Sequence, residues 1–407
     1  MDGQLNKKQQ RLAILALASV PLIMTLGNSM LIPILPLLEK KLDISKLQSS
    51  YIITMYSIVT IIFIPLSGYL SDRFGRKMVI VPALILTGIG GLVSGVAAWK
   101  MDNAFTVVII GRILQGIGAS GAMPVVIPLV GDMFKEEEEA SATLGIIETS
   151  NTVGKVLSPI LGAGLTALIW FLPFFSIPVL STISLILILL FIKKSSDDSD
   201  EEPFKFNQYW QQIKQIFRDH KRWLIAIFAI GAIVMFILFG FLFYLSTILE
   251  DDHDFDGVIK GFLLAIPLFA LATTSYITGK QIKDDTNKMK WLIVIGIVMA
   301  GASTLLIPLG KHYIYLLAVF FICGAGIGLT LPCLDSIITE NIEKDVRGSV
   351  TSLYSAMRFA GVATGPPIIA LLMKKQQWWM ISLFASLALI ASWLAWRKIY
   401  PKENKAT

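Results

Sequence analysis

The sequence predicts an all-α membrane protein, with twelve transmembrane helices arranged as two pseudo-symmetric six-helix bundles. Two observations lead to this fold class. Of the 407 residues, 55% are hydrophobic and only 16% are charged, whereas soluble domains carry about 25% charged residues. The apolar residues also form long runs of the roughly 20 residues that a helix needs to cross a bilayer. Helices are expected rather than strands because lipid cannot satisfy open backbone groups.

Twelve apolar runs can be placed along the chain, six on either side of a polar segment. The first run is too long for a cleavable signal peptide, and no small-residue cleavage site ends it, so we expect it to remain as a span. The predicted spans are 12–38, 48–70, 78–98, 105–133, 140–165, 174–192, 223–249, 262–282, 291–309, 313–338, 350–373 and 378–396.

The polar segment predicts three parts: an N-terminal bundle over 1–192, a cytoplasmic linker over 193–222 and a C-terminal bundle over 223–407. The linker begins with an acidic, serine-rich composition that favours a solvated chain. Its later apolar residues, among them Phe206 and Phe217, have helical spacing. They predict either a short amphipathic helix on the membrane surface or a linker with some residual helix.

The two halves repeat each other at a near-constant spacing, which predicts two similar bundles related by an axis along the membrane normal. The repeated residues of the fourth and tenth spans are Gly116, Gly118 and Pro124 with Gly324, Gly326 and Pro332. Those of the fifth and eleventh spans are Gly154 and Pro159 with Gly361 and Pro366.

A short polar loop separates the second span from the third. It reads Gly68-Tyr69-Leu70-Ser71-Asp72-Arg73-Phe74-Gly75-Arg76-Lys77. Gly75 permits a turn that a β-carbon would hinder, and Asp72 can lie against the positive end of a helix. The three basic residues suit an anionic inner leaflet.

This loop resembles the signature loop of the major facilitator superfamily of membrane transporters. The resemblance implies that the loop holds the two halves together on the cytoplasmic side when the protein opens outward. It also implies that Asp72 contacts the start of the eleventh span, near 348–351. A basic loop that only sets the topology is the alternative. The residues assigned to this gating loop are Gly68, Asp72, Arg73, Gly75, Arg76 and Lys77.

The fourth span places Arg112 inside an apolar helix, with Gln115 one turn further on. A cation there costs about 2.5–3.5 kcal/mol on insertion scales, so it needs a carboxylate, carbonyl groups or a water-filled cavity. The stretch resembles a second superfamily signature, which implies a part in proton coupling; an arginine that only joins helices is the alternative. The glycine pattern from Gly116 to Gly121 lies inside this helix and lacks the preceding strand of a dinucleotide site.

The fifth span indicates the class of transporter. Its small residues resemble the antiporter signature of drug:proton exporters, which implies close helix packing. Ser158 and Ala163 replace two glycines of that pattern, and both replacements are small. The residues assigned to this packing signature are Gly145, Gly154, Ser158, Pro159 and Gly162.

The same span has a polar stripe formed by Glu148, Asn151, Thr152 and Lys155. Their spacing puts them on one helix face, and intramembrane ionisable residues indicate function. Glu148 and Lys155 are too far apart along a regular helix for direct contact. We interpret Glu148 as the leading proton carrier, and Lys155 as a counter-ion or a contact for an anionic substrate. A static polar network is the alternative.

Two charges in the second half, Asp335 on the tenth span and Arg358 on the eleventh, could form a pair with a part in coupling or substrate binding. Asn28 lies where many drug:proton exporters of the superfamily have an acid, which implies that protonation takes place elsewhere. No metal is expected. The acidic loop 252–257 matches the first half of a calcium loop, but Leu263 stands where the last ligand would be.

These features predict a secondary transporter rather than an enzyme, without a cofactor. We expect a proton-coupled exporter of small amphipathic compounds or drugs, working by alternating access in the plasma membrane. The lysine and arginine bias of the loops predicts cytoplasmic termini. A monomer is expected, and nucleic-acid binding is not. The alternatives are a dedicated exporter of one metabolite such as a siderophore, a non-transporting receptor or scaffold, and an importer.

Overall fold

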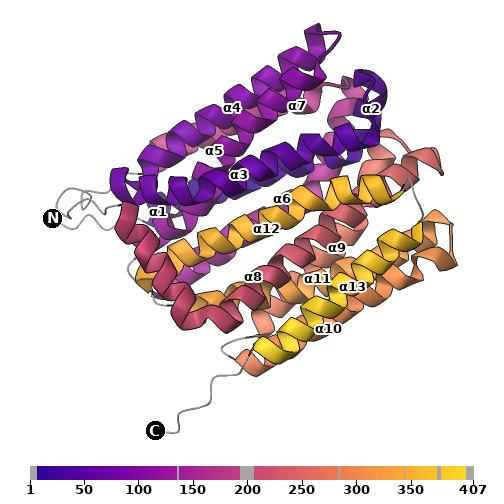
Figure 1. Cartoon of the computed structure of the whole chain (residues 1–407). Coiled ribbons are helices and arrows are strands. Elements are labelled where there is room, and N and C mark those ends of the chain that lie inside the picture. Colours follow the sequence, from indigo (N-terminus) through magenta and orange to yellow (C-terminus); the bar gives the residue numbers. More distant parts are fainter. Residues whose placement is uncertain are drawn as a thin grey trace. The chain divides into compact units, whose positions relative to one another are not determined.

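The computed structural model describes residues 7–134, 137–192, 206–282, 285–342, 344–373 and 377–399. All regular secondary structure in these ranges is helical (Figure 1), which confirms the predicted fold class. The helices of the first half, including one 3-10 turn, are α1 (Lys7–Ser29), η1 (Ile32–Ile34), α2 (Leu35–Leu42), α3 (Lys46–Phe74), α4 (Arg76–Lys100), α5 (Phe105–Met133), α6 (Glu137–Leu168) and α7 (Leu172–Phe191). Those of the second half are α8 (Phe206–Asp251), α9 (Gly257–Gln281), α10 (Thr286–Leu306), η2 (Ile307–Leu309), α11 (Tyr313–Asn341), α12 (Lys344–Met373) and α13 (Gln377–Lys398).

Eleven membrane-crossing helices are found among the described residues by length and composition, with α1 and α2 counted as one span. The helix outside this set is α6, which was predicted as the fifth span. It has 32 residues, enough to cross a bilayer at about 1.5 Å per residue. Its polar stripe interrupts its apolar residues, so its place in the membrane depends on burying that stripe against protein.

The chain divides into two compact units, Met1–Trp210 and Gln211–Thr407. In the first, the N-terminal unit, α5 packs along α3 and α4, α4 packs along α7, and α1 packs along α6 (Figure 1). In the second, the C-terminal unit, α11 packs along α9 and α10, and α10 packs along α13. Helices in corresponding positions of the two units therefore pack on corresponding neighbours.

The repeated glycines perform the same packing task in both units. A β-carbon at Gly116 would collide with the Tyr56 carbonyl on α3, and one at Gly324 would collide with the Pro267 carbonyl on α9. Gly118 lies in the same way against α4, and Gly326 against α10. Small residues let helix backbones approach closely in membranes, and these positions show where the repeat uses that property.

The second part of the linker is helical, and this helix is much longer than the linker itself. Residues 206–222 begin α8, which continues without a break to Asp251. Residues 206–222 contain no glycine or proline that would end a helix. The apolar face predicted on Phe206 and Phe217 lies outside the described side chains, as does segment 193–205.

Candidate functional site

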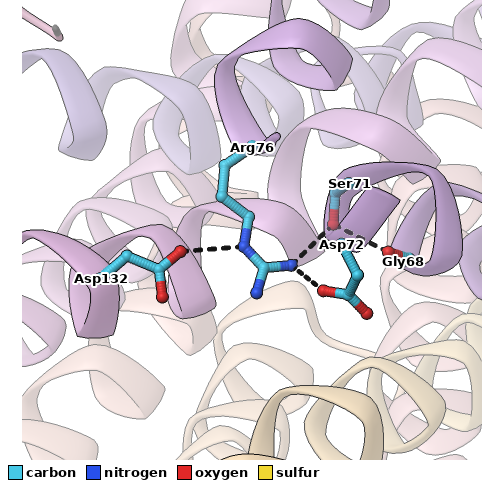
Figure 2. A network of polar contacts seen from close by, with 5 residues as sticks. All are labelled: Gly68, Ser71, Asp72, Arg76 and Asp132. Carbon is cyan, nitrogen blue, oxygen red and sulfur yellow. Dashed lines mark hydrogen bonds and ion pairs between the residues drawn. The ribbon is translucent and has the colours of Figure 1, made fainter. Parts of the chain in front are cut away.

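The turn between α3 and α4 centres on one arginine. Gly75, with φ at 91°, separates the two helices and leaves Arg76 as the first residue of α4. Figure 2 shows the Arg76 guanidinium between two carboxylates. Its Nε donates to Asp132 Oδ2 of α5 at 3.0 Å, and its Nη1 donates to Ser71 Oγ at 2.9 Å and pairs with Asp72. Arg76 thus joins α3, α4 and α5.

The other basic residues of this turn have different contacts. Lys77 donates to the carbonyl of Leu189 at 3.2 Å and to that of Ile192, so it caps the last turn of α7. Arg73 is exposed and donates to the Tyr69 hydroxyl at 3.1 Å. The predicted contact between Asp72 and residues 348–351 stays a prediction, because it would join the two units.

Arg112 of α5 is fully buried, with 0% of its surface exposed. Its Nε donates to the Ile52 carbonyl of α3 at 2.8 Å, and its Nη1 donates to the Gly27 carbonyl of α1 at 3.2 Å. The guanidinium carbon also lies 4.6 Å from the centre of the Tyr56 ring, a cation–π contact. Backbone carbonyls and an aromatic ring therefore supply much of what a cation needs in an apolar bundle.

Two side-chain amides complete the surroundings of Arg112. Nη2 donates to Asn28 Oδ1 of α1 at 2.7 Å, and Nη1 donates to Gln115 Oε1 one turn along α5. The hydrogen-bond acceptors found for Arg112 among the described residues are thus all neutral. This arrangement joins α1, α3 and α5, as the alternative of a helix-joining arginine predicted, and it leaves the role in proton coupling untested.

A second polar network connects α1 with α6. The Thr25 hydroxyl donates to Asn151 Oδ1 at 2.5 Å, and Asn151 Nδ2 donates to Glu148 Oε1 at 3.1 Å. Asn151 is 2% exposed and Lys155 is 7% exposed, while Glu148 is half-buried. The predicted stripe is therefore present, and its carboxylate is held by a side chain that another helix positions.

The small residues of α6 have unequal roles. A β-carbon at Gly162 would collide with the Met30 carbonyl, and one at Gly154 would lie 3.2 Å from the Leu22 carbonyl of α1. Ser158 is buried and donates to the Lys155 carbonyl at 2.9 Å, next to buried Pro159. Gly145, in contrast, has no described atom within 4 Å of the place where a β-carbon would be. Gly154 and Gly162 of the predicted signature therefore pack closely against the chain near α1, whereas Gly145 does not.

In the C-terminal unit, Arg358 of α12 forms an ion pair with Asp335 of α11, with Nη1 3.6 Å from Oδ1. The guanidinium carbon lies 5.6 Å from the centre of the Tyr354 ring. The Arg358 side chain is 14% exposed and the Asp335 side chain is 32% exposed. The pairing that the sequence suggested is therefore present in the structure.

Several contact residues were missed at the level of sequence. Tyr56, Thr25 and Asp132 are ordinary residues within apolar helices or at a helix end. Asp132 does carry a usable signal, because it is an acid at the end of the fourth span and close to a basic loop. The carbonyls that hold Arg112 have no signal in the sequence at all.

Charged side chains such as Arg112 and Lys155 thus lie buried within largely apolar helices, where charges are rare and usually functional. The sequence profile of the Major Facilitator Superfamily matches residues 17–366 and 286–407. The chain belongs to the Major Facilitator Superfamily. It is therefore a multi-pass membrane transporter and not an enzyme.

Relatives within the superfamily include exporters. The Bacillibactin exporter of Bacillus subtilis (strain 168) is 47% identical over 393 residues, covering 96% of this chain and 97% of the relative. Multidrug resistance protein 2 of the same organism is 23% identical over 367 residues, covering 88% of each chain. The crystal structure of the human organic anion transporter MFSD10 (TETRAN) matches with a TM-score of 0.75 at 17% identity, covering 95% of this chain and 99% of that one. This last likeness supports the major facilitator fold.

Proposed function

We propose that this protein is a secondary active exporter that moves a small molecule out of the cell in exchange for protons. It works by alternating access in the plasma membrane as a monomer, with both termini in the cytoplasm. The observation that supports this most directly is the network of Thr25, Asn151 and Glu148. A carboxylate held between two helices of one unit can gain or lose a proton as its surroundings change.

The cargo that we propose is a siderophore, bacillibactin or a close relative. Two observations favour it over a broad range of drugs. The chain is 47% identical to the Bacillibactin exporter but 23% identical to Multidrug resistance protein 2. Each unit also places a cation within its helices, Lys155 on α6 and Arg358 on α12. Such cations suit a cargo with negative charge or many acceptor oxygens.

The broader candidate, an exporter of amphipathic drugs, is supported by the multidrug relatives and by the antiporter signature of α6. It differs from the siderophore exporter in a measurable way. A multidrug exporter lowers the accumulation of unrelated lipophilic dyes, whereas a dedicated exporter leaves the dyes unaffected and changes only the release of its own cargo.

The test is an efflux screen in bacteria that lack their main exporters and express this chain. Bacillibactin and a panel of cationic and neutral dyes are followed inside and outside the cells, with and without a protonophore. We expect bacillibactin release that the protonophore abolishes. Release that persists without a proton gradient contradicts proton coupling, and an absence of any flux contradicts the proposed export.

A further inference from the structure

Each unit contains one turn that is built to the same plan. In the N-terminal unit it joins α2 to α3 over 39–49, and in the C-terminal unit it joins α8 to α9 over 250–260. Among the described residues other than glycine, positive φ angles occur at Asp43 (51°) and Asp254 (54°). These two aspartates occupy the same position in the two turns, counted from either end. The repeat therefore preserves an unusual backbone conformation.

The two turns are also closed by equivalent contacts. Glu39 Oε1 accepts from Ser49 Oγ at 2.6 Å, and Glu250 Oε2 lies 2.8 Å from Lys260 Nζ. Each glutamate is the first residue of its turn, and each donor is the fourth residue of the helix that follows. Ser49 is 0% exposed and Lys260 is 2% exposed. A buried hydroxyl in one unit is thus replaced by a buried ammonium in the other.

The charges around these contacts explain the replacement. The turn of the N-terminal unit has lysines at 40, 41 and 46 beside Glu39 and Asp43, so its charges are mixed. In the turn of the C-terminal unit every charged residue except Lys260 is acidic, namely Glu250, Asp251, Asp252, Asp254 and Asp256. Like charges at such short spacing repel one another, and a buried carboxylate needs a close partner.

We propose that Lys260 is the built-in counter-ion of this acidic turn. Its ammonium pairs with Glu250 and offsets the repulsion of the neighbouring carboxylates, so the left-handed turn at Asp254 forms without a bound cation. In the N-terminal unit the lysines of the turn itself offset the charge of the carboxylates. The Ser49 hydroxyl can therefore take the place of an ammonium as the donor to Glu39. Lys260 therefore acts as a positioning residue that keeps the end of α8 on the first turn of α9.

The experiment uses the full-length protein in detergent and measures its Tm in EDTA and in millimolar calcium chloride. We expect Lys260→Met to lower the Tm by several degrees in EDTA, with calcium restoring most of the loss, because the cation replaces the missing ammonium. Lys260→Arg should keep the wild-type Tm. Glu250→Gln combined with Lys260→Met should lose less than Lys260→Met alone and should respond less to calcium.

The matched control is Glu39→Gln in the N-terminal unit, because a glutamine oxygen can still accept from Ser49. It should leave the Tm nearly unchanged and insensitive to calcium. The proposal is overturned if Lys260→Met equals the wild type in EDTA. It is also overturned if calcium leaves the loss unchanged and the double variant loses as much, since Lys260 would then act by packing alone. If Lys260→Met yields no folded protein, recovery with calcium during purification supports the proposal, and failure to recover overturns it.

Discussion

Thr25 on α1 donates a hydrogen bond to Asn151 on α6, with the two oxygens 2.5 Å apart. The amide of Asn151 has a single orientation as a result, because its oxygen faces Thr25 and its nitrogen donates to Glu148 at 3.1 Å. The Glu148 carboxylate is thus positioned by a helix to which it does not belong. A movement of α1 against α6 would therefore change the hydrogen bonding of this carboxylate.

The first prediction concerns the charge of Glu148. We expect Glu148→Gln to abolish proton-driven transport in vesicles, while the Tm of the purified protein stays within a degree or two. A glutamine oxygen can still accept from Asn151, so the network keeps its geometry and loses only its titratable group.

The control for this prediction lies on the same helix. Glu139 of α6 accepts from Gln10 at 3.1 Å and is exposed. Glu139→Gln should transport as the wild type does. If Glu148→Gln keeps full proton-coupled transport, Glu148 has no part in the mechanism.

The second prediction separates the shape of Arg112 from its charge. Lysine offers three donors from one point, whereas arginine offers five in a planar fork. Arg112 uses this fork on α1, α3 and α5 at once. We expect Arg112→Lys to lower the free energy of unfolding by roughly 2–3 kcal/mol, because hydrogen bonds to a charged group are lost in a buried site.

Thermal unfolding of the purified protein measures this effect, and Arg73→Lys is the matched control. Arg73 is exposed and has one hydrogen bond to Tyr69, so its replacement should change the Tm little. Equal Tm values for Arg112→Lys and Arg73→Lys would show that the fork geometry of Arg112 does not stabilise the unit.

The third prediction compares two glycines of α6. Gly162→Ala places a methyl group against the Met30 carbonyl, and overpacking of this kind costs about 1–3 kcal/mol. Gly145→Ala meets open space, and alanine is favoured over glycine in a helix by about 1 kcal/mol. The two variants should therefore shift the Tm in opposite directions. A stabilising Gly162→Ala would mean that α6 can move away from the Met30 carbonyl without cost.

Most of the fold was predictable because apolar runs of bilayer length and repeated glycines are local properties of the chain. The turn at Gly75 and the pair of Asp335 and Arg358 were also predictable, since each depends on residue type and spacing. The acceptors of Arg112 were not, because a backbone carbonyl is present at every residue and only the packed helices select those of Gly27 and Ile52. The different packing of Gly145 and Gly162 was not predictable either, because only the packed helices determine which glycine faces a neighbouring backbone.

The fourth prediction concerns the two carboxylates that share Arg76. Asp132 and Asp72 both pair with its guanidinium, and the side chains are partly exposed, so each pair should contribute no more than about 1 kcal/mol. Asp132→Asn or Asp72→Asn alone leaves Arg76 with one carboxylate and with Ser71. We therefore expect small losses of Tm for the single variants and a larger loss for the double variant than the two losses combined.

A double-mutant cycle on thermal unfolding, with Arg76→Gln as the reference background, measures this coupling. Without Arg76 the two aspartates repel each other, so Asp132→Asn should stabilise the protein in that background instead of destabilising it. The reversal of sign follows from charge alone and does not depend on the shape of the turn. Additive losses in the presence of Arg76, together with no reversal in its absence, would show that the two carboxylates act independently and that Arg76 does not join α3 to α5.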